Sequence, residues 1–163
     1  MINPEKTFVI DTESDGLLRE ATRFWVAVSL NFATGDEFIF VDPKHDFIDH
    51  LEKAECVIMH NALGHDRPLI QKLLNYEIPK EKIIDTLVLS KFNNPDRRVP
   101  SGWTGTPKPH SVEAWGMRFG IPKPKHEDWS QYSDEMLHRC REDTRIQLRV
   151  TKALLKEFRE TYK

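Results

Sequence analysis

The sequence predicts a mixed α/β domain, built on a sheet that is antiparallel on one side and parallel beyond, and flanked by helices. Residues 6–12, 23–32 and 37–42 are rich in aromatic and β-branched residues and are separated by polar turns, which is typical of an antiparallel meander. After residue 42, apolar strand-like runs alternate with helical periodicity, which favours parallel strands joined by helices. A chain of 163 residues with 39% hydrophobic content is the size of one domain with a single core, so we expect one domain over residues 1–163.

The alternating part of the chain begins with a short helix near residues 46–54 and a buried strand at 56–60. Residues 66–76 then have helical spacing, with apolar side chains at Leu69, Leu73 and Tyr76. The segment "KIIDTLVLSKF" predicts a short strand that continues into a helix.

Residues 93–109 have no periodicity and contain four prolines, two glycines and two adjacent arginines. We interpret them as a long exposed loop, because loops of this length in a compact domain are usually functional or disordered. Helical spacing resumes in "HSVEAWGMRFG", where Ser111 is a plausible N-cap and Gly120 a plausible stop. The last helix is expected to begin near Ser133 and to reach about Tyr162.

Charge and cysteine content exclude several classes of protein. The 24 basic and 26 acidic residues are nearly balanced, so binding of a partner by bulk charge alone is not expected. The sequence has no apolar run long enough to span a bilayer and no secretory signal, so we expect a cytoplasmic protein without a membrane partner. Two cysteines outside any CxxC pair favour a reducing compartment and argue against a zinc–thiolate site. His60 and His65 lack the spacing of a metal-binding pair.

Paired carboxylates follow the first strand, at Asp11 and Glu13. Residues i and i+2 of a strand point to the same face, so these carboxylates should lie side by side and repel each other unless a positive charge lies between them. The alternative is that both are solvated at the end of a strand.

Two further acids occupy positions with both a structural and a functional interpretation. Asp66 is placed to cap the helix that Arg67 and Pro68 begin. Asp143 lies on the apolar stripe of the last helix, where an unpaired carboxylate is unfavourable without a cation or a hydrogen-bond network. Pairing with a lysine or arginine is its structural alternative. If Asp11, Glu13, Asp66 and Asp143 converge at the end of the first strand, they meet the ligand requirement of Mg²⁺ or Mn²⁺.

Three motifs resemble those of a known superfamily. "DTE" after the first strand, "HNALGHD" after a later one and "HRCRED" in the last helix resemble the exonuclease motifs of the DEDD superfamily of 3′-to-5′ exonucleases, which have a ribonuclease-H-like fold. More narrowly, "IIDTLVLSKF", "HSVEAWGMRFG", "SDEMLHRCRED" and "TKALLKEF" resemble the proofreading exonuclease domain of family A DNA polymerases from phages. The resemblance implies such a domain standing alone, without a polymerase domain, and a phage origin.

By this resemblance, two divalent metal ions, Mg²⁺ or Mn²⁺, would be bound by Asp11, Glu13, Asp66 and Asp143. Family A exonuclease domains carry a tyrosine four residues before the last aspartate, where this chain has Arg139. Arginine stays protonated and cannot act as a base. His138, five residues before Asp143, has the spacing of the histidine-type branch, so we expect His138 to be the general base.

Four residues are candidates for substrate binding. Leu17 follows the first motif, where the family wedges an apolar side chain against the terminal base. Asn61 matches an asparagine of the second motif, although it also suits a turn. Trp103 is placed either to stack on a base or to pack its loop, and Arg139 to contact the substrate near the site. Positive charge for the rest of the strand is expected from Arg97, Arg98, Lys108, Lys123 and Lys125.

The sequence therefore predicts a metal-dependent 3′-to-5′ exonuclease. It would release nucleoside monophosphates from single-stranded or frayed DNA ends by phosphodiester hydrolysis, as proofreading exonuclease domains do. RNA is not excluded as the substrate. The alternatives are a non-catalytic module that binds nucleic acid or a DNA polymerase, and an endonuclease of the ribonuclease H class. If the protein is phage-encoded, its expected location is the host cytoplasm.

Overall fold

The computed structural model describes residues 2–163 and is built on one five-stranded sheet with the strand order β3-β2-β1-β4-β5. The strands are β1 (Thr7–Ser14), β2 (Phe24–Asn31), β3 (Glu37–Val41), β4 (Cys56–Met59) and β5 (Ile83–Asp85). The strands β1, β2 and β3 pair antiparallel, whereas β4 pairs parallel with both β1 and β5. This sheet confirms the predicted mixed α/β class.

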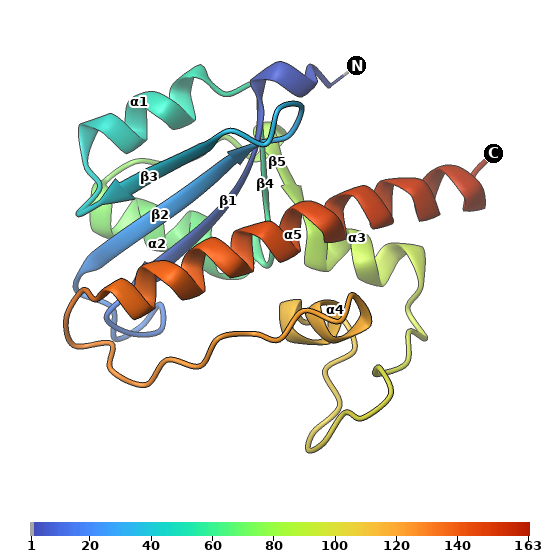
Figure 1. The fold of residues 1–163 in the computed structure, drawn as a ribbon. Coiled ribbons are helices and arrows are strands. Elements are labelled where there is room, and N and C mark those ends of the chain that lie inside the picture. The colour runs from blue at the N-terminus through green and yellow to red at the C-terminus, as the bar shows by residue number, and fades with distance from the viewer. Residues whose placement is uncertain (1) are drawn as a thin grey trace.

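The helices cover both faces of the sheet (Figure 1). They are α1 (His45–Lys53), α2 (Arg67–Leu74), α3 (Thr86–Asn93), α4 (Val112–Arg118) and α5 (Asp134–Thr161), with short 3₁₀ turns at Pro4–Lys6 and Lys80–Lys82 and a π-helical turn at Ala62–Asp66. The helices α1 and α2 pack on one face, and α5 crosses the other face beside β1 and β2 (Figure 1). None of the helices in residues 2–163 is long and apolar enough to cross a membrane.

Alternation along β1 decides which side chains face α5. Ile10 joins the core that α1 and α2 cover, whereas Val9 packs on the opposite face of the sheet. Asp11 and Glu13 have the same parity as Val9, so they point toward α5. The two carboxylates therefore face the helix that carries Asp143.

The ends of the helices follow the predicted caps. The hydroxyl of Ser111 accepts a hydrogen bond from the backbone N–H of Ala114, and Ser133 accepts one from Met136 at the start of α5. Gly120 has a φ of +71°, which permits the chain to turn after α4. Between α3 and α4 the chain forms turns without a helix or strand.

Candidate active site

The end of β1 holds Asp11 and Glu13 in the predicted side-by-side arrangement. A carboxylate oxygen of each residue and the sulfur of Cys140 all lie within 4.8 Å of one another. Cys140 is fully buried, and its thiol donates a hydrogen bond to the backbone carbonyl of Asp11 over 3.5 Å. Burial and the neighbouring acids raise the pKa of this thiol well above its usual value, so the sulfur stays protonated. Of these three side chains, the two carboxylates are therefore the ones that can bind a hard metal ion.

The turn after β4 delivers Asp66 to the same end of the sheet. Asn61 adopts the left-handed conformation with a φ of 61°, and Asp85 accepts hydrogen bonds from the backbone N–H groups of Asn61 and Leu63. Asp66 follows in the π-helical turn and makes no capping hydrogen bond to α2. Instead, its Oδ1 accepts a hydrogen bond of 2.5 Å from the hydroxyl of Thr12. The capping alternative for Asp66 is therefore wrong.

The helix α5 contributes Asp143, which is only 5% exposed. Its Oδ2 lies 3.3 Å from the ammonium nitrogen of Lys123 and 4.0 Å from Nε of Arg139. Its Oδ1 is buried and has no hydrogen-bond partner among the described residues. Pairing with basic residues, the structural alternative for Asp143, thus occurs on one carboxylate oxygen and leaves the other free.

One turn further along α5, Gln147 reaches back to the first motif. Its side-chain amide donates a hydrogen bond of 3.0 Å to Asp11 Oδ1. Because Gln147 is 2% exposed, its rotamer is held by packing. This contact orients the Asp11 carboxylate within the site.

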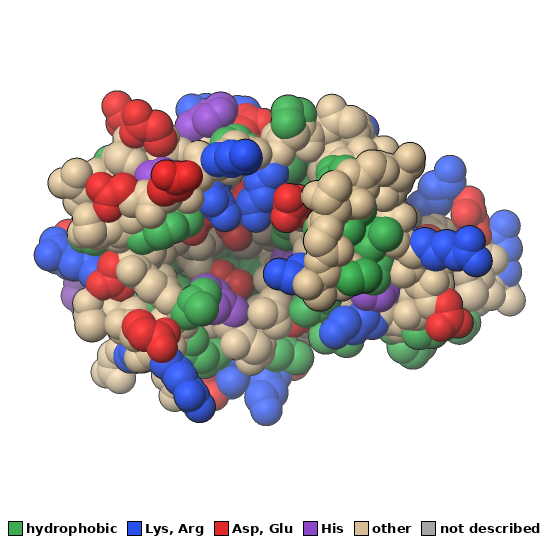
Figure 2. All heavy atoms as spheres, turned by 90° about the horizontal axis from the view of Figure 1, so that it is seen from below, with side chains coloured by type: hydrophobic (Ala, Val, Ile, Leu, Met, Phe, Trp, Pro, Cys, Tyr) green, Lys and Arg blue, Asp and Glu red, His purple; other side chains and the backbone are tan. Residues whose placement is uncertain are grey.

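These side chains line one open cleft of about 250 Å³. Figure 2 shows a hollow on the underside of the molecule, with acidic side chains in its floor and basic side chains around it. The cleft is lined by Asp11, Thr12, Glu13, His60, Asn61, His65, Asp66, Val112, Lys123, Arg139, Asp143 and Gln147.

Burial and mutual repulsion disfavour ionisation of Asp11, Glu13 and Asp143. The pKa of Asp11 is raised to about 8, mainly by burial and then by the charges of Asp143 and Asp66. Burial likewise raises the pKa of Glu13 well above its usual value, and Asp11 adds to the effect. Burial also raises the pKa of Asp143, although Lys123 and Arg139 oppose it. At neutral pH the cluster therefore lacks the positive charge that would allow these carboxylates to ionise together.

Divalent cations fit this site by two criteria. The ligands are carboxylate oxygens, which Mg²⁺ and Mn²⁺ prefer. The buried Oδ1 of Asp143 also has no partner, and leaving a buried acceptor unsatisfied is unfavourable. A bound cation would relieve both the repulsion and the unsatisfied acceptor.

The histidines around the acids have different settings, and His60 and His65 both line the cleft. His138 is exposed and lines a neighbouring hollow with Lys123 and Glu142, outside the cleft of the carboxylates, so its role as general base stays a prediction. His65 lies inside the cleft, with Nδ1 4.0 Å from Asp66 Oδ1. The neighbouring Asp66 carboxylate raises the pKa of His65, so its imidazole carries a proton over a wider pH range.

A second hollow of about 310 Å³ adjoins the cleft and shares Thr12, Glu13, His65 and Arg139 with it. Leu17 is 74% exposed and lines this hollow together with Trp129. The guanidinium of Arg139 lies 5.0 Å from the centre of the Trp129 ring. The candidate residues Leu17 and Arg139 are therefore brought together beside the acids.

The other substrate candidates occupy different places. Asn61 lines the cleft, whereas Trp103 lines a hollow in its own loop and donates a hydrogen bond to the carbonyl of Thr106. The guanidinium of Arg97 pairs with Glu157 at 2.7 Å and packs 4.6 Å over the ring of Trp115. Arg97 is thus engaged in holding its loop against α4 and α5.

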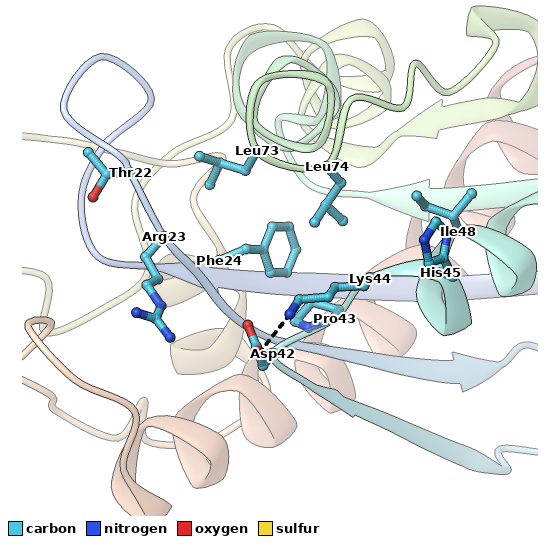
Figure 3. Close-up of a pocket in the computed structure, with 10 residues that line it drawn as sticks. All are labelled: Thr22, Arg23, Phe24, Asp42, Pro43, Lys44, His45, Ile48, Leu73 and Leu74. Atoms are coloured by element: carbon cyan, nitrogen blue, oxygen red, sulfur yellow. Dashed lines mark ion pairs between the residues drawn. The ribbon is translucent and has the colours of Figure 1, made fainter.

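A further hollow of about 470 Å³ lies outside the site, between the start of β2, the start of α1 and the end of α2 (Figure 3). Phe24 forms part of its wall, and Lys44 pairs with Asp42 at 3.5 Å within it (Figure 3). None of the predicted site residues lines this hollow.

Sequence reasoning missed Thr12, Gln147 and Trp129 as site residues, and it did not place Lys123 against Asp143. Gln147 had a detectable signal, because it lies four residues after Asp143 on the same helical face. Trp129 and Lys123 come from the segment 121–132, which has no helix or strand and no periodicity that would place them.

The mixed sheet and its flanking helices define a ribonuclease-H-like fold. No family model matches the chain. The DNA-directed DNA polymerase of Escherichia phage T7 is 28% identical over an alignment of 193 residues, which covers 92% of this chain and 26% of the polymerase. The chain is thus homologous to a phage DNA polymerase, as predicted, and spans about a quarter of its length.

Solved structures share the fold at lower identity. Brucella melitensis NrnC with bound Mg²⁺ has a TM-score of 0.70 and 16% identity, covering 96% of this chain and 75% of NrnC. Escherichia coli RNase D, an exoribonuclease, has a TM-score of 0.61 and 15% identity, covering 93% of this chain and 39% of RNase D. These likenesses confirm the predicted ribonuclease-H-like fold.

Proposed function

We propose that this chain is a metal-dependent 3′-to-5′ exonuclease that hydrolyses the terminal phosphodiester bond of single-stranded or frayed DNA. The observation that carries the proposal is the convergence of Asp11, Glu13, Asp66 and Asp143 on one open cleft. Homology to a phage DNA polymerase supports DNA as the substrate and the host cytoplasm as the location.

Two divalent ions, Mg²⁺ or Mn²⁺, are the proposed cofactors of this cleft. When bound, they supply activation of the attacking water and stabilisation of the leaving 3′ oxygen. The chain's own residues arrange this chemistry, since Thr12 and Gln147 orient Asp66 and Asp11 through hydrogen bonds. His138 is the proposed proton acceptor for the attacking water.

The adjoining hollow is the proposed place of the terminal nucleotide. Leu17 and Trp129 offer apolar surfaces to a base, and such contacts tolerate any sequence. Arg139 lies between this hollow and the acids, where its guanidinium suits a backbone phosphate. Asn61 is a proposed substrate contact in the cleft. Trp103 is a proposed substrate contact in its own loop, away from the cleft.

Hydrolysis of a 5′-labelled single-stranded DNA oligonucleotide tests the proposal. With Mg²⁺ or Mn²⁺ we expect a ladder that shortens stepwise from the 3′ end, and no ladder with EDTA or with the Asp11→Ala variant. A circular single strand should stay intact, because an exonuclease requires an end, whereas its cleavage would favour an endonuclease.

An exoribonuclease is the second candidate, because RNase D shares the fold. A matched RNA oligonucleotide degraded faster than DNA would favour this alternative. An intact DNA and RNA strand under both metals would instead support a non-catalytic module. Copurification with a DNA polymerase would then test the proposed protein partner.

A further inference from the structure

Lys123 lies on the segment 121–132, which runs from α4 back beneath α5 to the start of that helix (Figure 1). Pro122 and Pro124 flank it, and each proline fixes its own φ and so restricts the local backbone. The Lys123 side chain is 26% exposed and reaches into the cleft, where its ammonium lies 3.3 Å from Asp143 Oδ2.

The charge of Lys123 acts on three of the four acids. It lowers the pKa of Asp11, Glu13 and Asp143, opposing the effect of burial on each. Arg139 adds positive charge from a greater distance, at 4.0 Å from the same oxygen of Asp143. Of the two basic side chains beside Asp143, Lys123 therefore lies closer to the carboxylate than Arg139 does.

A divalent ion and the Lys123 ammonium require the same oxygens. An ion that uses Asp143 as a ligand would lie within a few ångströms of the ammonium, and two cations at that separation repel each other. The free Oδ1 of Asp143 is open to an ion, but Oδ2 is engaged by Lys123. Binding of the ion therefore disfavours the present position of Lys123.

We infer that Lys123 is an internal counter-ion of the metal-free site, which competes with the divalent cation for Asp143. The inference rests on the metal site of the proposed function and adds a residue that tunes the affinity of that site. Lys123 stabilises the folded chain when the metal is absent, and its displacement leaves the ammonium at the cleft for the phosphate of a bound strand.

An ordinary structural ion pair gives a different expectation. If Lys123 only stabilises the segment 121–132, its loss lowers the stability of the protein with and without metal and leaves the affinity for metal unchanged. Metal affinity, measured without any nucleic acid, therefore distinguishes competition from a structural role.

The test is a calorimetric titration of the full chain with Mg²⁺ and with Mn²⁺ at a fixed pH near 8, where protons compete less for the carboxylates. The variants are Lys123→Met and Lys123→Gln, which remove the charge, and Lys123→Arg, which keeps it. Lys125→Met is the matched control, because Lys125 is an exposed lysine on the same segment and does not line the cleft. Melting temperatures with EDTA and with saturating Mg²⁺ give a second readout.

We expect both neutral variants to bind the metal about tenfold more tightly than the wild type, because a tethered competing charge is removed. Their melting temperature should be lower in EDTA and should rise more on addition of Mg²⁺. Lys123→Arg and Lys125→Met should resemble the wild type. Metal affinity in both neutral variants that is equal to or weaker than that of the wild type would overturn this inference and leave the proposed function standing. A wild type that binds neither ion would instead overturn the metal dependence of the proposed function.

Discussion

The side-chain amide of Gln147 donates a hydrogen bond of 3.0 Å to Oδ1 of Asp11, across a sequence separation of 136 residues. Both side chains line the cleft, but the amide is neutral and supplies no negative charge to balance a divalent ion. Gln147 therefore acts as a positioning residue for the first carboxylate.

We expect Gln147→Met to lower kcat with Mg²⁺ about tenfold, because Asp11 loses the donor that orients it. Stability should change by no more than about 1 kcal/mol, because the substitution also removes Gln147 Oε1, a buried acceptor without a partner. Single-turnover hydrolysis and urea unfolding measure the two effects. Gln131→Met, at an exposed position, is the control, and an unchanged rate for Gln147→Met would contradict the positioning role.

The stability of the metal-free protein should fall as the pH rises. The pKa of Asp11 is about 8 in the folded protein against an ordinary value of 3.8, so between these values the folded state holds a proton that the unfolded state has released. The stabilisation is present below pH 3.8 and is lost as the pH rises through 8, at up to ~1.4 kcal/mol per pH unit for one group. Thermal unfolding in EDTA across this range measures the trend.

Asp11→Asn provides the comparison for that pH series. The amide keeps the shape of the side chain and cannot ionise, so the metal-free variant should be more stable than the wild type near pH 8 and less sensitive to pH. Saturating Mg²⁺ should also weaken the trend in the wild type, because the cation replaces the proton. A wild type whose stability rises with pH in EDTA would contradict the assigned shift.

The variants His138→Ala and His65→Ala should separate the roles of these two histidines. If His138 is the general base, its loss should lower kcat about 100-fold and leave metal affinity largely intact. Since Asp66 raises the pKa of His65, this imidazole is more often already protonated and less available as a base, and we expect its loss to affect KM more than kcat. Steady-state kinetics at several pH values distinguish the roles, and an unaltered kcat for His138→Ala would exclude it as the base. Arg139→Ala should lower kcat less than His138→Ala does.

Leu17→Ala should weaken binding of the terminal nucleotide without unfolding the protein. Leu17 is 74% exposed, so its truncation removes little core packing. We expect KM for a single-stranded oligonucleotide to rise about tenfold, since burial of a leucine side chain against a base contributes about 1.5–3 kcal/mol. Leu63→Ala, at a residue that is 48% exposed and lines neither hollow, is the matched control. Equal KM values for both variants would contradict the proposed contact of Leu17 with the terminal base.

Much of the fold could be predicted from local sequence patterns. The meander, the buried strand at Cys56–Met59 and the capped helices α4 and α5 appear close to their predicted bounds, because side-chain periodicity and capping residues act over a few positions. The strand β1 extends to Ser14, beyond its predicted end, and so holds Glu13 within the ladder.

The sequence by itself determined that Asp11 and Glu13 share one face of a strand and that Asp143 lies on the packed face of a helix. Only the tertiary structure decided that α5 crosses that face, that Gln147 reaches Asp11 and that Lys123 reaches Asp143. Periodicity reports the direction of a side chain relative to its own element. It carries no information about contacts that depend on how distant segments pack, and the irregular segment 121–132 has no period from which to infer such contacts.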